Sequence, residues 1–291
     1  MNSLFCFGFG YCAEALASRL ATRGWRITGT SRSVEGAARI SRMGYRGLVS
    51  GGGADDPDLP VALAEASHLL ISAAPDADGD PILGDGTDTW RPAPSLEWIG
   101  YLSTIGVYGD TQGAWVDEQT PPNPMQERAR RRLAAEQAWL DFGTRFSRKV
   151  QIFRLAGIYG PGRSVIDDLK AGSARRIVKP GQVFNRIHVA DIAQTLEAAI
   201  RLGAPGQVYN LTDDEPASSE AVLLFAAQLL GLEPPPATPI ELATLSPMAA
   251  SFYADNRRVR NERIKQELGV KLTYPTYREG LWALVQSGKT S

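Results

Sequence analysis

The stretch LFCFGFGYCAEALA, residues 4–17, decides the fold. Its apolar run, residues 4–7, predicts a buried strand that passes directly into Gly8, Gly10 and Ala13. This G-x-G-x-x-A spacing opens a dinucleotide-binding helix: Gly8 permits a tight turn, Gly10 lets a pyrophosphate approach the backbone, and Ala13 allows close packing on the strand. The free N–H groups of the first helical turn would then face the phosphates. An ordinary glycine turn is the alternative interpretation.

The flanking sequence supports the nucleotide interpretation. A helix to about residue 23 and a second strand over residues 25–30 complete a unit of the expected length. Further strands are expected at residues 47–50, 68–73 and 96–103, with helices at 34–43 and 61–66 between them. Strands that alternate with helices predict an α/β fold with a Rossmann-type doubly wound parallel sheet, whose ligands bind at the carboxyl ends of the strands.

Composition narrows the class of protein. The 291 residues are 43% hydrophobic and 22% charged, as in an ordinary globular protein, and the formal net charge of -1 argues against a nucleic-acid partner. No run reaches the roughly 20 apolar residues of a membrane helix, and no secretory signal is visible, so a cytoplasmic location without a membrane partner is expected. Two cysteines and two histidines make a metal site improbable.

The ends of the second and fourth strands carry the expected cofactor contacts. An NAD site would place an acid after the second strand, but Thr30, Ser31 and Arg32 stand there, which suits the 2′-phosphate of NADP. A solvated basic loop is the alternative. The small residues after the fourth strand would let the cofactor lie close. The expected cofactor-binding residues are therefore Gly8, Phe9, Gly10, Tyr11, Cys12, Thr30, Ser31, Arg32, Ala73, Ala74, Pro75 and Ser103, with NADP favoured over NAD.

Four later stretches carry a family resemblance. They are YLSTIGVYGD at 101–110, RLAGIYGPGR at 154–163, FNRIHVADIA at 184–193 and VYNLTDDEP at 208–216. Together with the first glycine turn, they resemble the extended short-chain dehydrogenase/reductase superfamily, also labelled NAD-dependent epimerase/dehydratase. The resemblance implies that Thr104, with Ser103 beside it, offers a hydroxyl to the reacting oxygen; a strand that simply ends in polar residues is the alternative.

The chain departs from that family on the next helix. The run RRLAAEQ, residues 131–137, aligns Glu136 with a family acid, which puts Arg132 at the position of the catalytic Lys and Arg128 at that of the catalytic Tyr. No Tyr-x-x-x-Lys occurs anywhere in the sequence. Arginine, with a pKa above about 12, cannot take a proton at neutral pH. Four residues apart, the two side chains share a helix face and are expected to clamp a carboxylate or phosphate; a solvated helix face is the alternative.

The resemblance places further residues at the substrate. Tyr159 is a candidate alternative acid, although its Y-G-P context is also ordinary turn chemistry. The expected substrate-binding residues are Tyr108, Arg163, Asn185, Arg186 and His188. Asp191 is expected to cap the following helix. The basic cluster over residues 257–263 is expected to be a solvated face, because two glutamates are interleaved with it or follow it closely.

The sequence therefore predicts two parts and one of two functions. Residues 1–160 with 186–212 should form the Rossmann domain, and residues 161–185 with 213–291 a small α+β substrate lobe. The first hypothesis is an atypical NAD(P)-dependent oxidoreductase or epimerase/dehydratase, with Thr104, Arg128, Arg132 and Tyr159 at the catalytic site and a small, carboxylate- or phosphate-bearing substrate. The second is a non-catalytic NADP-binding redox sensor or partner-binding module. The sequence does not give the oligomeric state.

Overall fold

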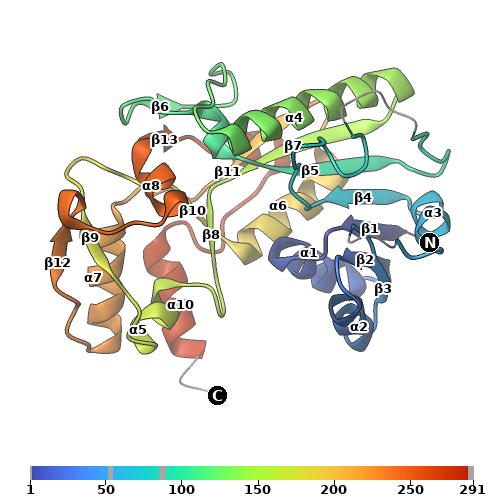
Figure 1. The fold of residues 1–291 in the computed structure, drawn as a ribbon. Coiled ribbons are helices and arrows are strands. Elements are labelled where there is room, and N and C mark those ends of the chain that lie inside the picture. The colour runs from blue at the N-terminus through green and yellow to red at the C-terminus, as the bar shows by residue number, and fades with distance from the viewer. Residues whose placement is uncertain (1, 52–54, 85–89, 288–291) are drawn as a thin grey trace.

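Seven parallel strands form the central sheet of the structure, a computed structural model that describes residues 2–51, 55–84 and 90–287. The strand order is β11-β7-β5-β4-β1-β2-β3, as Figure 1 shows. Their bounds in that order are Val208–Leu211, Lys149–Leu155, Trp98–Thr104, His68–Ile71, Ser3–Phe7, Arg26–Ser31 and Arg46–Val49. The predicted doubly wound α/β fold is confirmed. Because the order reverses between β1 and β4, the carboxyl ends of these two strands border the crevice where such sheets bind ligands.

Helices cover both faces of this sheet. On one face lie α1 (Tyr11–Ala21), α2 (Val34–Arg42) and α6 (Val189–Leu202), and on the other α3 (Leu59–Ala64) and α4 (Glu127–Phe146). Strand β1 shows how the sequence makes the two layers: Leu4 and Cys6 enter one hydrophobic core and Phe5 enters the other. Side chains alternate between faces along a strand, so a fully apolar strand reads as buried on both sides.

A smaller third core lies beside the sheet. It is built by α5 (Val165–Lys170), α7 (Ser219–Leu230) and α10 (Tyr277–Ser287). The two-stranded pair β9 (Arg176–Val178) and β12 (Ala237–Pro239) lies beside α7. Two further parallel pairs are β8 (Gly157–Tyr159) with β10 (Arg186–His188), and β6 (Trp115–Val116) with β13 (Arg258–Val259). The remaining elements are η1 (Ile105–Tyr108), η2 (Ile240–Leu242), α8 (Pro247–Ala254) and α9 (Glu262–Leu268). The domain boundaries stay a prediction.

The expected cap of α6 is wrong. His188, not Asp191, occupies the cap position, and its Nδ1 accepts a hydrogen bond from the Ala190 N–H at 3.1 Å. Strand β10 runs straight into the helix, so α6 begins three residues earlier than the cap expectation required. Asp191 lies inside the first turn and accepts instead from the backbone N–H groups of Thr273, at 2.7 Å, and Tyr274, at 3.1 Å. It ties α6 to the segment before α10.

Candidate cofactor-binding and active site

The turn between β1 and α1 is shaped for a phosphate group. Gly8 has φ +84°, and a Cβ there would lie 2.9 Å from the backbone N of Ala73, so only glycine fits. At Gly10 a Cβ would meet only the Ser72 Oγ, at 3.9 Å, so open space lies outside the loop. No side chain caps α1, which leaves its first-turn N–H groups available to an anion. These residues fit the pyrophosphate of a dinucleotide.

Two of the predicted cofactor residues hold this turn from behind. Thr30 is 2% exposed; its Oγ1 accepts from the Gly8 N–H and its carbonyl from the Phe9 N–H, both at 2.8 Å. The Phe9 ring packs against Gly29, where a Cβ would come within 2.3 Å of it, and lies 5.8 Å from the Tyr45 ring. The Thr30 hydroxyl thus accepts a hydrogen bond that fixes the loop, and its part in binding a 2′-phosphate stays a prediction.

The end of β2 carries positive charge without an acid. Ser31 is half-buried and Arg32 is exposed, and Ser33 caps α2 by accepting from the Gly36 N–H at 3.1 Å. From α2, Arg39 reaches back to the Phe9 carbonyl at 3.4 Å and to Glu14 at 2.8 Å. Arg39 was not among the predicted residues; its place in the second turn of a helix that follows the end of β2 was the available signal.

The other predicted cofactor residues line the same edge. The N–H of Ala73 donates to the Phe7 carbonyl at 3.0 Å, while Ala74 is exposed and Pro75 half-buried. Tyr11 is half-buried at the start of α1. The Cys12 side chain is 5% exposed, and burial raises the pKa of its thiol to about 11. Cys12 can therefore offer a cofactor its backbone N–H, whereas its thiol is buried and protonated.

At the end of β5, Ser103 and Thr104 have different surroundings. The Ser103 hydroxyl donates to Glu136 Oε1 at 2.5 Å, and Glu136 pairs with Arg154 at 2.7 Å in a network with both side chains buried. Thr104 is half-buried, and its Oγ1 accepts from the Gly106 N–H at 3.0 Å, which leaves the hydroxyl hydrogen free to donate. The Thr104 hydroxyl can therefore still donate a hydrogen bond, whereas the Ser103 hydroxyl already donates to Glu136 of α4.

The two arginines of α4 take different partners. Arg132 donates to the Leu102 carbonyl and lies 5.7 Å from the centre of the Tyr101 ring, so it fastens α4 to β5. Arg128 is exposed; it donates to the Ser251 Oγ at 2.7 Å and its guanidinium lies 4.5 Å from the centre of the Phe252 ring. Both partners of Arg128 belong to α8. The clamp formed by the two side chains stays a prediction, and Arg128 is the exposed member.

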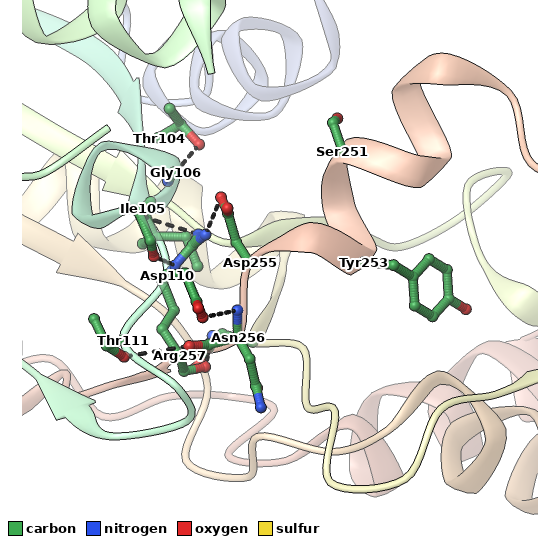
Figure 2. Close-up of polar contacts among 12 residues, drawn as sticks. Thr104, Ile105, Gly106, Asp110, Thr111, Ser251, Tyr253, Asp255, Asn256 and Arg257 are labelled. Carbon is green, nitrogen blue, oxygen red and sulfur yellow. Dashed lines mark hydrogen bonds and ion pairs between the residues drawn. The ribbon is translucent and has the colours of Figure 1, made fainter. Parts of the chain in front are cut away.

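A buried arginine ties the segment after α8 to the turn after Thr104 (Figure 2). Arg257 donates to the carbonyls of Gly109, at 2.6 Å, and Ile105, at 3.3 Å, and pairs with Asp255 at 2.5 Å. The expectation of a solvated face is wrong for Arg257, which is 9% exposed. The carbonyls it satisfies are far away in sequence, and so its burial was not visible in the local pattern.

The two candidate tyrosines are buried and bonded. The Tyr108 hydroxyl donates to Asn210 Oδ1 at 2.8 Å, with the Arg154 guanidinium 4.9 Å from its ring centre. The Tyr159 hydroxyl donates to the Thr276 carbonyl at 3.4 Å. Burial raises the pKa of both phenols, which is opposite to the lowering that an acid/base tyrosine needs.

Three predicted substrate residues are likewise engaged within the protein. Asn185 donates to the Arg257 carbonyl at 3.0 Å and accepts from the Val259 N–H at 2.9 Å. Arg186 donates to the Phe184 and Ala217 carbonyls, each at 3.0 Å. His188 is 4% exposed, and burial lowers its pKa to about 4, so this helix cap is neutral at pH 7. Their roles at the substrate stay predictions.

Arg163, the remaining predicted substrate residue, lies next to α1. Its guanidinium is 5.8 Å from the centre of the Tyr11 ring, and the Tyr11 hydroxyl donates to the Pro161 carbonyl at 3.0 Å. The structure thus brings together the Gly8 turn, Tyr11 and Arg163 at one edge of the sheet.

Comparisons with known proteins agree with this architecture. The model of the "NAD dependent epimerase/dehydratase family" matches residues 96–212. "Protein YeeZ" of Escherichia coli strain K12 is 31% identical over 285 residues, which cover 94% of this chain and 97% of YeeZ. This chain belongs to the NAD dependent epimerase/dehydratase family. The resemblance to the extended short-chain dehydrogenase/reductase superfamily is thereby confirmed.

Solved structures of this family's fold extend the comparison. A conserved protein of unknown function from Silicibacter pomeroyi is 48% identical, with a TM-score of 0.89 over 99% of this chain and 100% of that one. The dTDP-glucose 4,6-dehydratase of Bacillus anthracis, solved in complex with NAD, is 17% identical, with a TM-score of 0.78 over 100% of this chain and 97% of that one.

Among the helices of the described residues, none combines the length and the apolar character that a membrane span requires.

Proposed function

We propose that this chain is an NAD(P)-binding oxidoreductase or epimerase/dehydratase-type enzyme that favours NADP and acts on a small anionic substrate. The observation that carries the proposal is the turn at the β1/β4 crevice, where Gly8 and Gly10 leave the first-turn N–H groups of α1 without a side-chain cap. Such a terminus stabilises a pyrophosphate through backbone donors and the helix dipole. The similar fold of the Bacillus anthracis dehydratase, solved with NAD, supports the same cofactor class.

The preference for NADP rests on the charges at the end of β2. Arg32 is exposed there, and Arg39 lies against the Phe9 carbonyl. An acid at this position would hydrogen-bond the ribose hydroxyls of NAD and repel a 2′-phosphate, whereas a guanidinium binds that phosphate. We therefore assign the 2′-phosphate to Arg32, with Arg39 as the second cation.

The catalytic proposal uses Thr104 and Arg128. A bound nicotinamide would supply or accept a hydride. The Thr104 hydroxyl would donate to the reacting substrate oxygen, because its lone pair is taken by the Gly106 N–H while its hydrogen is free. Arg128 would exchange its Ser251 hydroxyl partner for the substrate carboxylate or phosphate, a stronger acceptor. Solvent water would move the proton, since both candidate tyrosine hydroxyls are buried and donate to protein acceptors.

The alternative is a non-catalytic NADP-binding redox sensor. It is favoured by the two arginines at the relay positions, one fastened to the Leu102 carbonyl and the other to α8. A sensor must bind the oxidised and reduced cofactor differently, because a ligand with equal affinity for two states shifts neither. Equal affinities, together with no effect of either form on association with another protein, would count against this alternative.

The test begins with binding. Isothermal calorimetry should give tighter binding of NADPH than NADH, and Arg32→Ala should weaken NADPH by about tenfold while leaving NADH unchanged. Arg42→Ala, an exposed arginine on the same helix as Arg39, is the matched control. The absorbance of the reduced nicotinamide is then followed with a library of carbonyl compounds that carry carboxylates or phosphates. Cofactor binding without turnover across the library would contradict the enzyme and leave the sensor.

A further inference from the structure

Residues 160–163 form a tight turn that is pressed onto the beginning of α1. Gly160 and Arg163 exchange backbone hydrogen bonds of 3.0 and 3.1 Å. A Cβ at Gly160, which has φ +156°, would lie 2.5 Å from the Tyr11 hydroxyl and 2.8 Å from the Val189 side chain. The turn tip is fixed by the bond from the Tyr11 hydroxyl to the Pro161 carbonyl, at 3.0 Å. The turn therefore has a defined seat against the helix.

This seat places a cation beside the uncapped helix terminus. The Arg163 guanidinium lies 5.8 Å from the centre of the Tyr11 ring, and its charge acts on Tyr11 and on Cys12, both in the first turn of α1. Arg163 is exposed, and in the described ranges of the chain no carboxylate forms an ion pair with it. An unpaired guanidinium held next to free N–H groups is the arrangement that binds a phosphate group.

We propose that Arg163 is a cofactor-binding residue: from its place beside the first turn of α1 it pairs with the pyrophosphate of the bound dinucleotide. The inference rests on the proposed function and assigns Arg163 to the cofactor instead of the substrate. Tyr11 is the positioning residue, because its hydroxyl holds the turn that carries the guanidinium. The pyrophosphate is common to NAD and NADP, so Arg163 contributes to both equally and does not set the preference between them.

The experiment measures the dissociation constants of NADH and NADPH by calorimetry for the whole chain. Arg163→Ala should weaken both about tenfold or more, and Arg163→Lys, which keeps the charge without the planar fork, should weaken both by less. Tyr11→Phe should weaken both about two- to threefold, because the turn loses its tie but the cation stays. Arg175→Ala, which removes an exposed arginine bonded to the Thr244 carbonyl, is the control and should bind like the wild type. Melting temperatures show whether each variant is folded.

Four outcomes decide the matter. Equal weakening of both dinucleotides by Arg163→Ala, with Arg175→Ala unchanged, supports the inference. If the wild type binds and Arg163→Ala binds both within twofold of it, Arg163 does not contact the cofactor and the inference is overturned while the proposed function stands. If Arg163→Ala weakens NADPH alone, the guanidinium contacts the 2′-phosphate and the pyrophosphate assignment is overturned. A wild type that binds neither dinucleotide overturns the proposed function itself.

Discussion

The substitution Glu136→Gln tests how the end of β5 is held. Glu136 accepts from the Ser103 hydroxyl at 2.5 Å and forms an ion pair with Arg154 at 2.7 Å; its side chain is 3% exposed and that of Arg154 is 6% exposed. Arg154 also lies 4.9 Å from the centre of the Tyr108 ring. Glutamine has almost the same volume as glutamate, so the substitution removes the negative charge without opening a cavity.

The expected loss of stability follows from leaving the Arg154 charge buried and unpaired. Removing one member of a buried ion pair costs about 3–5 kcal/mol. For a chain of 291 residues the unfolding entropy is about 0.6 kcal/mol/K, so the melting temperature should fall by about 5–8 °C. The double variant Glu136→Gln with Arg154→Met should recover part of this loss, because it removes the charge that the single substitution leaves unpaired.

Differential scanning calorimetry of the wild type and the variants is the assay. Glu127→Gln is the matched control, because Glu127 pairs with Arg130 and Arg131 on the exposed face of the same helix, and its melting temperature should equal that of the wild type. The reasoning fails if Glu136→Gln melts within 1–2 °C of Glu127→Gln, roughly the precision expected of such a comparison, or if the double variant is less stable than the single one.

Three further predictions concern protonation and α8. Burial lowers the pKa of His188 from 6.5 to about 4, so the unfolded chain binds more protons between these values and the free energy of unfolding falls as the pH drops from about 6.5 to 4. The variant His188→Asn, which keeps a helix-capping side chain, should remove up to about 3 kcal/mol of that loss, as measured by urea unfolding. Burial raises the pKa of Asp213 from 3.8 to about 8, so the folded chain holds the extra proton and stability falls as pH rises toward 8; Asp213→Asn should abolish this decline, and an unchanged slope would refute the assignment. Arg128→Ala removes the hydrogen bond to Ser251, so amide exchange of α8 should speed up severalfold by mass spectrometry, whereas Arg130→Ala should match the wild type. Equal exchange in both arginine variants would show that Arg128 does not hold α8.

The fold was readable from the sequence because its signals are local. An apolar run followed by Gly8 and Gly10 specifies a strand, a turn and a helix within a few residues, and the helix predicted at 34–43 is found as α2, Val34–Arg42. The helix predicted at 61–66 begins two residues earlier because Pro60 is accommodated in its first turn. The strand alternation that follows leaves few arrangements open to the sheet.

The hydrogen-bond partners of the polar side chains could not be predicted from the sequence. Thr30 is at the predicted strand end, but its hydroxyl bonds the Gly8 N–H, and Arg132 meets the Leu102 carbonyl across 30 residues of sequence. Such pairings depend on which groups the packed elements bring within 3.5 Å, and no spacing in the chain encodes that distance. The sequence therefore predicts a cofactor edge at the ends of the strands, and the structure adds the hydrogen-bond partners of the individual side chains there.

The contacts of Arg257 can form only late in the synthesis of the chain. Its bond to the Gly109 carbonyl joins residues 148 positions apart. At about 5–20 residues per second, a ribosome needs roughly 7–30 s to travel from the turn after Thr104 to the arginine that satisfies its carbonyls. The groups that hold the glycine turn of β1 and α1, which include Thr30 and the Ala73 backbone, belong to the first 73 residues, so this edge can form early. The Thr104 turn acquires its buried donor only when nearly nine-tenths of the chain exists. The two halves of the site are thus separated in time during translation, and a nascent chain can hold the first without the second.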